Sequence, residues 1–312
     1  MKIAIVGGAG FIGSHVVDAL IEDDHKVIVV DNLFLGKKEN VNPKADFFEI
    51  DATEFLLLKC LFDEFKPDVV YNLAVLPLPH SLECPCDNVM KNVQITTNLL
   101  ELQLRNWFGR LIHFSSSEVY GSAIYTPMCE NHPLESSTPY AASKAACDLI
   151  CLSYQRTFGN RVAIIRPFNN YGPRQNDKSY AGIIPLTINR MKNGQMIVVY
   201  GDGKQTRDYI YVKDTAKAAL MLLYRPDLDG EIINIASGRD ISVETLINEI
   251  VIAWRQVTGS DAMFPVQMSP ERPGDVRRHI ANVLKAKDVL GFETTVCINE
   301  GLKETIKFYL NK

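Results

Sequence analysis

The chain has 312 residues, of which 46% are apolar and 22% are charged, and its formal net charge is −4. A chain of this length and balance predicts one large or two smaller domains around a sizeable core, because domains usually contain about 100–200 residues. The small negative charge offers no large basic field, so the composition argues against binding to nucleic acid or to an anionic membrane surface.

The amino-terminal segment contains one short apolar run, Ile3–Val6, which glycines follow at once. This run is too short for a signal sequence, and no later stretch approaches the ~20 apolar residues that a membrane helix needs. We therefore expect a cytoplasmic protein. The seven cysteines are scattered, and no spacing of cysteine, histidine or acidic residues is typical of a metal site, so reduced thiols and no metal are expected.

Short apolar runs alternate with helical segments through the first half of the chain. The runs predicted as strands are Lys2–Val6, Lys26–Val30, Asp46–Ile50, Asp68–Leu73, Arg110–Phe114 and Arg161–Arg166. The segments predicted as helices are Phe11–Glu22, Glu54–Phe65, Asp87–Asn106 and Tyr140–Phe158. Continuous apolar strands separated by helices are typical of a parallel sheet covered on both faces, and right-handed crossovers then predict a doubly wound α/β sheet of the Rossmann type.

The regular alternation of predicted strands and helices ends at about Asn169. After this point, turn-forming segments interrupt shorter strands and helices. We interpret residues 1–168 as a dinucleotide-binding domain and residues 169–312 mainly as a smaller, mixed α/β substrate lobe. Parts of the later chain are expected to return to the main sheet.

Glycines mark the turn after the first predicted strand. Gly7, Gly10 and Gly13 are spaced three apart, and Phe11 and Ile12 stand between them at the start of the first helix. Glycine allows the close approach of backbone that this turn needs, and the free N–H groups at the helix end favour a pyrophosphate. This context predicts a dinucleotide site.

Acidic residues end the next two predicted strands. Asp31 can accept hydrogen bonds from both ribose hydroxyls and would repel a 2′-phosphate, which favours NAD over NADP. Asp51 is placed to reach the adenine, although Asp51–Glu54 also has the pattern of a capping box for the following helix. The expected cofactor site is completed by Asn32, Ala52, Leu73 and Ala74.

Tyr140 and Lys144 stand four residues apart, on one face of the predicted helix Tyr140–Phe158. A lysine cation beside a phenol lowers the pKa of the phenol from about 10 toward neutrality. Tyr140 could then take a proton from a hydroxyl while a hydride leaves the same carbon. The serines of Phe114–Gly121 follow a strand and should emerge at the carboxyl edge of the sheet, where such sheets bind ligands.

Several motifs together make the chain similar to the extended short-chain dehydrogenase/reductases, the nucleotide-sugar epimerases and dehydratases. They span nearly the whole chain and comprise Gly7–Gly13, Asp31-Asn32, Ser116–Gly121, Tyr140–Lys144, Arg166–Arg174, Gly201–Asp208 and Arg272–Asp275. The resemblance implies an NAD-dependent enzyme acting on a nucleotide sugar. It also implies that Tyr140 is the base, that Lys144 is its partner and that Ser116 holds the substrate hydroxyl.

The same resemblance extends to the substrate and the assembly. It implies that Asn169, Arg207 and Arg272 bind the substrate diphosphate, which suits the planar and permanently charged guanidinium. UDP is the favoured nucleotide, joined to a hexose or an N-acetylhexosamine. Relatives pair the helices that match Asp87–Asn106 and Tyr140–Phe158 in a dimer interface, so a homodimer is expected.

The segment after the fourth predicted strand departs from the family. Asn72–Val75 stands where the family usually has His-Leu-Ala-Ala, and the following loop, Leu76–Ser81, is unusually apolar and rich in proline. We expect this loop to line the substrate or nicotinamide pocket. Ser81 is expected among the substrate-binding residues, and His80 is a further candidate for substrate contact.

Glu118 favours a dehydratase. It stands two residues after Ser116, where similar dehydratases carry a working glutamate. A carboxylate beside NAD can move protons at C5 and C6 of a 4-keto sugar. Dehydratases that carry an Asp-Glu pair have aspartate at the position of Ser117. Ser117 is a further candidate catalytic residue.

Other reactions stay open. A 4-epimerase of a UDP-hexose, a UDP-N-acetylhexosamine or UDP-glucuronate is the main alternative, because Arg272–Arg277 is similar to epimerase sequences. A UDP-glucuronate decarboxylase is less favoured, because Tyr140–Asp148 looks more like dehydratase sequence. A protein that only binds the dinucleotide is disfavoured, because such proteins would be expected to lack the tyrosine, lysine and serine set.

Overall fold

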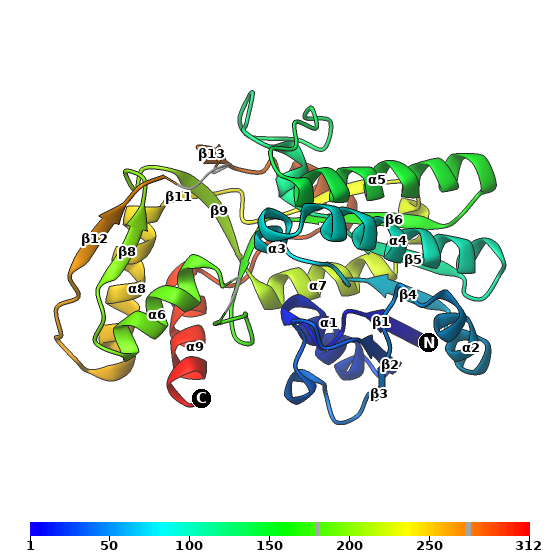
Figure 1. The fold of residues 1–312 in the computed structure, drawn as a ribbon, viewed down its shortest axis with the longest axis horizontal. Helices are drawn as coiled ribbons and strands as arrows, with labels where there is room; N and C mark the ends of the chain where they lie inside the picture. The colour runs from blue at the N-terminus through cyan, green and yellow to red at the C-terminus, as the bar shows by residue number, and fades with distance from the viewer. Residues whose placement is uncertain (179–180, 272–275) are drawn as a thin grey trace.

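The computed structural model describes residues 1–178, 181–271 and 276–312. Its larger part is a seven-stranded parallel sheet (Figure 1). The strands follow the order β10-β6-β5-β4-β1-β2-β3 across the sheet. Their bounds are β1 Lys2–Val6, β2 Lys26–Asp31, β3 Asp46–Glu49, β4 Val69–Asn72, β5 Arg110–Phe114, β6 Val162–Pro167 and β10 Ile232–Ile235.

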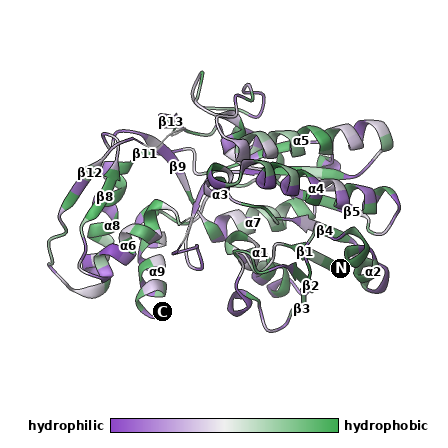
Figure 2. Cartoon of the chain, in the orientation of Figure 1, coloured by the Kyte–Doolittle hydropathy of each residue, from purple (hydrophilic) through white to green (hydrophobic). Residues whose placement is uncertain are grey.

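Two layers of helices bury the two faces of this sheet. Alternate residues of β1 enter opposite apolar clusters, with Ile3 and Ile5 in one and Ala4 and Val6 in the other. The first cluster is covered by α1 (Phe11–Glu22) and α7 (Val212–Leu223). The second is covered by α2 (Phe55–Phe65), α4 (Pro85–Leu104) and α5 (Pro139–Phe158). Because both faces of the sheet are buried, its strands need apolar residues at nearly every position. Figure 2 shows the hydropathy of each residue along the ribbon.

A smaller lobe with its own apolar cluster lies beside the carboxyl edge of the sheet (Figure 1). Its strands are β7 Asn169–Tyr171, β8 Ile197–Tyr200, β9 Thr206–Tyr211, β11 Asp240–Ser242, β12 Val266–Ser269 and β13 Arg278–His279. Its helices are α6 Ile183–Lys192, α8 Val243–Thr258 and α9 Ile298–Leu310. Short elements complete the described chain: α3 Leu78–Glu83, η1 Lys38–Asn40, η2 Ser117–Tyr120, η3 Pro226–Leu228 and η4 Ala286–Leu290.

The predicted fold class, a doubly wound parallel sheet with a mixed C-terminal region, is confirmed. The later chain contributes β10 and α7 to the main sheet and its cover, while the division at residue 168 stays a prediction. No described helix has the length and apolar character that crossing a membrane requires.

Two local predictions were wrong. Leu76–Ser81 is not a loop throughout, because the helix α3 begins at Leu78 after Pro77, whose fixed φ suits a helix start. The capping box at Asp51–Glu54 does not form, because α2 begins only at Phe55 and no side chain caps it. Asp51 instead accepts hydrogen bonds from the backbone N and the hydroxyl of Thr53, at 2.9 and 2.7 Å.

We predict that Arg110→Met lowers the free energy of unfolding by about 3–5 kcal/mol, because it breaks a buried ion pair. The buried Arg110 guanidinium pairs with Asp229 at 2.5 Å and donates to the carbonyl oxygens of Leu222, Leu223 and Arg225, which joins β5 to the end of α7. Chemical denaturation measures the effect.

The matched control is Arg161→Met, which removes the exposed second partner of Asp229, at 2.9 Å, and should cost about 0–1 kcal/mol. Equal effects of the two substitutions would contradict the assignment of Arg110 to the core.

Candidate active site

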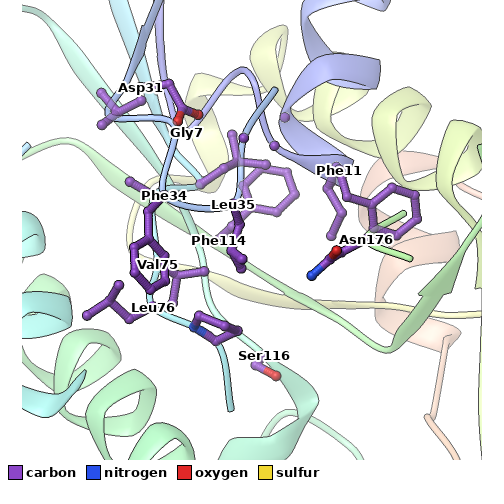
Figure 3. A pocket seen from close by; sticks show the side chains of 18 of the residues that line it. Gly7, Phe11, Asp31, Phe34, Leu35, Val75, Leu76, Phe114, Ser116 and Asn176 are labelled. Carbon is purple, nitrogen blue, oxygen red and sulfur yellow. The ribbon is translucent and has the colours of Figure 1, made fainter. Parts of the chain in front are cut away.

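A cavity of about 600 Å³ opens at the carboxyl edge of the main sheet (Figure 3). It runs from Gly7 and Asp31, at the ends of β1 and β2, to Ser116 after β5. Parallel strands bring their carboxyl ends to one edge, so residues far apart in the sequence meet here. The cavity lining includes every predicted cofactor-binding residue: Gly7, Gly10, Phe11, Ile12, Gly13, Asp31, Asn32, Asp51, Ala52, Leu73, Ala74, Tyr140 and Lys144.

The turn from β1 into α1 has no room for side chains at two of its glycines. Gly7 has a φ of +86°, and a Cβ there would lie 2.5 Å from the backbone N of Ala74. A Cβ on Gly13 would lie 2.2 Å from the carbonyl oxygen of Gly7. No side chain caps α1, and its first turn lines the cavity. This cradle fits a pyrophosphate, which binds backbone N–H groups at a helix end.

Asp31 is fixed at the rim of the cradle. Its carboxylate accepts hydrogen bonds from the backbone N of Ala9 at 3.0 Å and of Leu33 at 2.8 Å. Burial raises the pKa of Asp31, and these two hydrogen bonds oppose the rise. An oriented, nearly buried carboxylate fits the two ribose hydroxyls of a dinucleotide.

A second carboxylate, that of Asp51, also lines the cavity. Asn32 donates to Asp51 at 2.9 Å. Partial burial opposes the charge, but hydrogen bonds from Thr53 and Asn32 keep the pKa of Asp51 below its usual value. Several other lining residues were not predicted, because they come from loops, from η1 and from one face of α4, where no motif marks them: Phe34, Leu35, Lys37, Asn40, Lys91, Gln175 and Asn176.

Tyr140 and Lys144 lie on α5 and both line the cavity. The pKa of Tyr140 is raised to about 12, mainly by burial and also by the charge of Glu118, while a hydrogen bond with Ser116 opposes the rise. The predicted lowering of this pKa by Lys144 is not present. Lys144 donates instead to the carbonyl oxygen of Phe114, and burial lowers the pKa of its own ammonium group.

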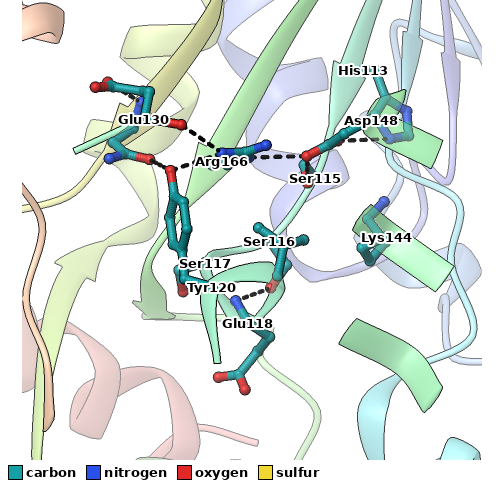
Figure 4. Close-up of polar contacts among 12 residues, drawn as sticks. His113, Ser115, Ser116, Ser117, Glu118, Tyr120, Glu130, Lys144, Asp148 and Arg166 are labelled. Carbon is teal, nitrogen blue, oxygen red and sulfur yellow. Dashed lines mark hydrogen bonds and ion pairs between the residues drawn. The ribbon is translucent and has the colours of Figure 1, made fainter. Parts of the chain in front are cut away.

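The turn after β5 carries the three predicted catalytic residues of this segment (Figure 4). The Ser116 hydroxyl accepts a hydrogen bond from the backbone N of Glu118 at 3.2 Å and thereby caps η2. Glu118 and Ser117 line the cavity with Ser116, and Ser117 is buried. The site therefore brings a phenol, a hydroxyl and a carboxylate together beside the cofactor cradle.

A second cavity, of about 180 Å³, adjoins the first in the C-terminal lobe. Asn169 lines both cavities, and Arg207 lines the second. Arg207 donates to the carbonyl oxygens of Thr206 and Val276, which holds its guanidinium in place. The rest of the lining had no predicted role: Ile183, Leu186, Thr187, Arg190, Val198, Tyr200, Gln205, Tyr209 and Val243.

One predicted substrate-binding residue does not line either cavity, and another lies outside the described residues. Ser81 is buried in α3, where its hydroxyl donates to the carbonyl oxygen of Leu78 at 2.6 Å, and it does not line a described cavity. Arg272 lies outside the described residues. His80 is buried against the ring of Phe34, with ring centroids 5.5 Å apart, whereas Leu76–Pro79 line the larger cavity as predicted.

Across the described chain, no group of three or more histidine, cysteine or acidic side chains is arranged to hold a metal ion.

The sequence of this chain is similar to those of known proteins over its whole length. The model of the NAD dependent epimerase/dehydratase family matches residues 3–236. A UDP-glucose 4-epimerase of Mycolicibacterium smegmatis is 32% identical over 324 residues, covering 100% of this chain and 99% of that protein.

Two solved structures are similar over the whole chain. The UDP-glucose 4-epimerase of Thermotoga maritima, solved with UDP-glucose, has a TM-score of 0.93 and 35% identity, covering 100% of this chain and 99% of that one. The dTDP-glucose 4,6-dehydratase of Streptomyces venezuelae, solved with NAD, has a TM-score of 0.91 and 30% identity, covering 100% and 98%.

We predict that Asp31→Ser weakens NAD binding by about ten- to a hundredfold, because a hydrogen bond to a charged group contributes about 1.5–3 kcal/mol. The affinity for NADP should fall less, because the variant lacks the carboxylate that repels the 2′-phosphate of NADP. The ratio of the two dissociation constants, measured by calorimetry, should therefore shift toward NADP by about tenfold or more. Asp63→Ser, on the exposed surface of α2, is the control, and an unchanged ratio in Asp31→Ser would contradict the role of Asp31.

Proposed function

Because the chain belongs to the NAD-dependent epimerase/dehydratase family of enzymes and uses NAD, we propose that it is a nucleotide-sugar dehydratase that works through a 4-keto sugar. The observation that carries this proposal is the position of Glu118, which lines the same cavity as Tyr140 and Ser116. Its charge acts on the Tyr140 phenol. The favoured substrate is a UDP-hexose or a UDP-N-acetylhexosamine.

Tyr140 and Ser116 are suited to the first step. The Tyr140 phenolate would take the proton of the sugar C4 hydroxyl, while the Ser116 hydroxyl, hydrogen-bonded to Tyr140, holds the sugar oxygen. Bound NAD supplies the hydride acceptor for C4. Burial of Tyr140 disfavours the phenolate, so a positive charge, such as that of the Lys144 ammonium group in the same cavity, would be needed to stabilise the phenolate before it accepts this proton.

Glu118 is suited to the second step. The new C4 carbonyl acidifies the proton on C5, and the Glu118 carboxylate would remove it. The same carboxyl group, now protonated, would deliver that proton to the C6 hydroxyl, which leaves as water while the C5–C6 double bond forms. The hydride taken from C4 would then return to the sugar together with a proton, so that the net change is the loss of one water. Asn169 and Arg207 would hold the diphosphate from the second cavity, since both line it.

A 4-epimerase is the second candidate. Two of the similar proteins above, from Mycolicibacterium smegmatis and Thermotoga maritima, are named UDP-glucose 4-epimerases. An epimerase would use Tyr140 and Ser116 in the same way, and the keto sugar would rotate before C4 is reduced from its other face. Glu118 would then only bind the sugar.

Two further expectations belong to the proposal, a cytoplasmic location and a homodimer. The helices α4 and α5 lie side by side on one face of the sheet (Figure 1). Their outer surface carries exposed apolar side chains, Met90 on α4 and Leu149 on α5. A second copy of the chain would cover both and remove them from water.

We predict that Glu118→Gln abolishes loss of water, with a fall in turnover of about 10²–10⁴, because the amide cannot accept the C5 proton. Exchange of hydride between the sugar C4 and NAD should remain, since Tyr140 is intact. Mass spectrometry of the products and the absorbance of reduced NAD in single turnovers report the two steps separately.

Tyr140→Phe should abolish both steps, and Glu64→Gln, on α2, is the charge-matched control. Full dehydration by Glu118→Gln would rule out the proposed acid–base role.

We predict that Leu149→Glu yields a monomer, because a buried and unpaired carboxylate is costly at an apolar interface. Light scattering should give about twice the chain mass of 35.0 kDa for the unsubstituted protein and a single chain mass for the variant. A single chain mass for both would refute the homodimer.

A further inference from the structure

A network of buried polar side chains lies behind the candidate catalytic turn (Figure 4). Asp148, on α5, is fully buried. Its carboxylate accepts hydrogen bonds from the Ser115 hydroxyl at 2.8 Å and from the Arg166 guanidinium at 2.9 Å. Ser115 directly precedes Ser116, so one carboxylate ties α5 to the start of the turn.

Arg166 extends the network to the other end of the turn. Its guanidinium donates to the Tyr120 hydroxyl at 2.9 Å and to the carbonyl oxygen of Glu130 at 3.2 Å, and it stacks on the Tyr120 ring. Tyr120 ends η2 and in turn donates to Asn234 of β10 at 2.7 Å. The residues between these two anchors include Ser116 and Glu118.

The helix α5 carries both the candidate base and the anchoring carboxylate. Tyr140, Lys144 and Asp148 follow one another at intervals of four residues, which places them along one face of the helix. The base and the carboxylate that anchors Ser115 are therefore carried by one rigid element. Asp148 and Arg166 do not line either described cavity, so they cannot act by touching the substrate.

Moving a charged pair from water into the protein interior costs free energy. A protein with an apolar pair of the same volume in its place is often at least as stable. Stability alone therefore gives no reason for this pair. The need for a fixed geometry does give a reason for the pair, because reaction rates depend on sub-ångström placement of the reacting groups.

We propose that Asp148 and Arg166 are positioning residues that hold Ser116 and Glu118 at working distance from Tyr140 by anchoring both ends of the turn. This inference rests on the proposed function, since it assumes that Tyr140 and Ser116 act on the substrate.

The test is the double variant Asp148→Asn/Arg166→Met, which removes the pair without leaving one charge unpaired. We expect kcat to fall by about ten- to a hundredfold, the effect of a displacement of about 1 Å, while KM stays within roughly threefold and the content of bound NAD is unchanged. Tyr120→Phe, a milder change that removes only the hydroxyl anchor, should lower kcat in the same direction with KM unchanged.

Asp214→Asn is the matched control for a buried carboxylate outside the site. Asp214 accepts hydrogen bonds from the backbone N of Thr295 at 3.1 Å and of Val296 at 3.2 Å, and its loss should lower the melting temperature but leave kcat per folded molecule unchanged.

The inference is overturned if both the double variant and Tyr120→Phe, compared at equal folded fractions, keep the kcat of the unsubstituted protein while Tyr140→Phe is inactive. An active Tyr140→Phe would instead overturn the proposed function and, with it, the premise of this inference.

Discussion

Backbone packs directly on backbone where the turn after β1 meets the end of β4, and the cavity depends on this contact. Gly7 donates to the carbonyl oxygen of Val30 at 2.8 Å, and Leu73 donates to that of Val6 at 2.8 Å. A Cβ on Gly7 would lie 2.5 Å from the backbone N of Ala74, so the turn and the strand end pack against each other with no side chain between them. The helix end, Asp31 and the serine turn are all aligned by the sheet to which that strand belongs.

Much of this arrangement is predictable from the sequence because it follows from local periodicity and glycine chemistry. The helix Phe11–Glu22 and the strands Lys2–Val6 and Arg110–Phe114 have the predicted bounds. The cofactor residues line one cavity because parallel strands must end at one edge.

The rest depends on contacts between segments far apart in the sequence. The partner of Lys144 is a backbone carbonyl of β5, which no spacing reveals. Ser81 turns to its own helix because α3 forms where the sequence suggested a loop. The anchoring of the serine turn joins α5, β6 and β10, and only the folded chain brings Asp148, Arg166 and Asn234 together.

The proposed reaction depends on whether Glu118 moves protons or only binds the sugar. The most direct measurement is a mass spectrum of the products after the purified protein is incubated with NAD and a panel of UDP-, dTDP-, GDP- and CDP-hexoses. The account predicts that one substrate, a UDP-sugar, gives a product lighter by one water. A product of unchanged mass with a new chromatographic position would contradict it and establish an epimerase.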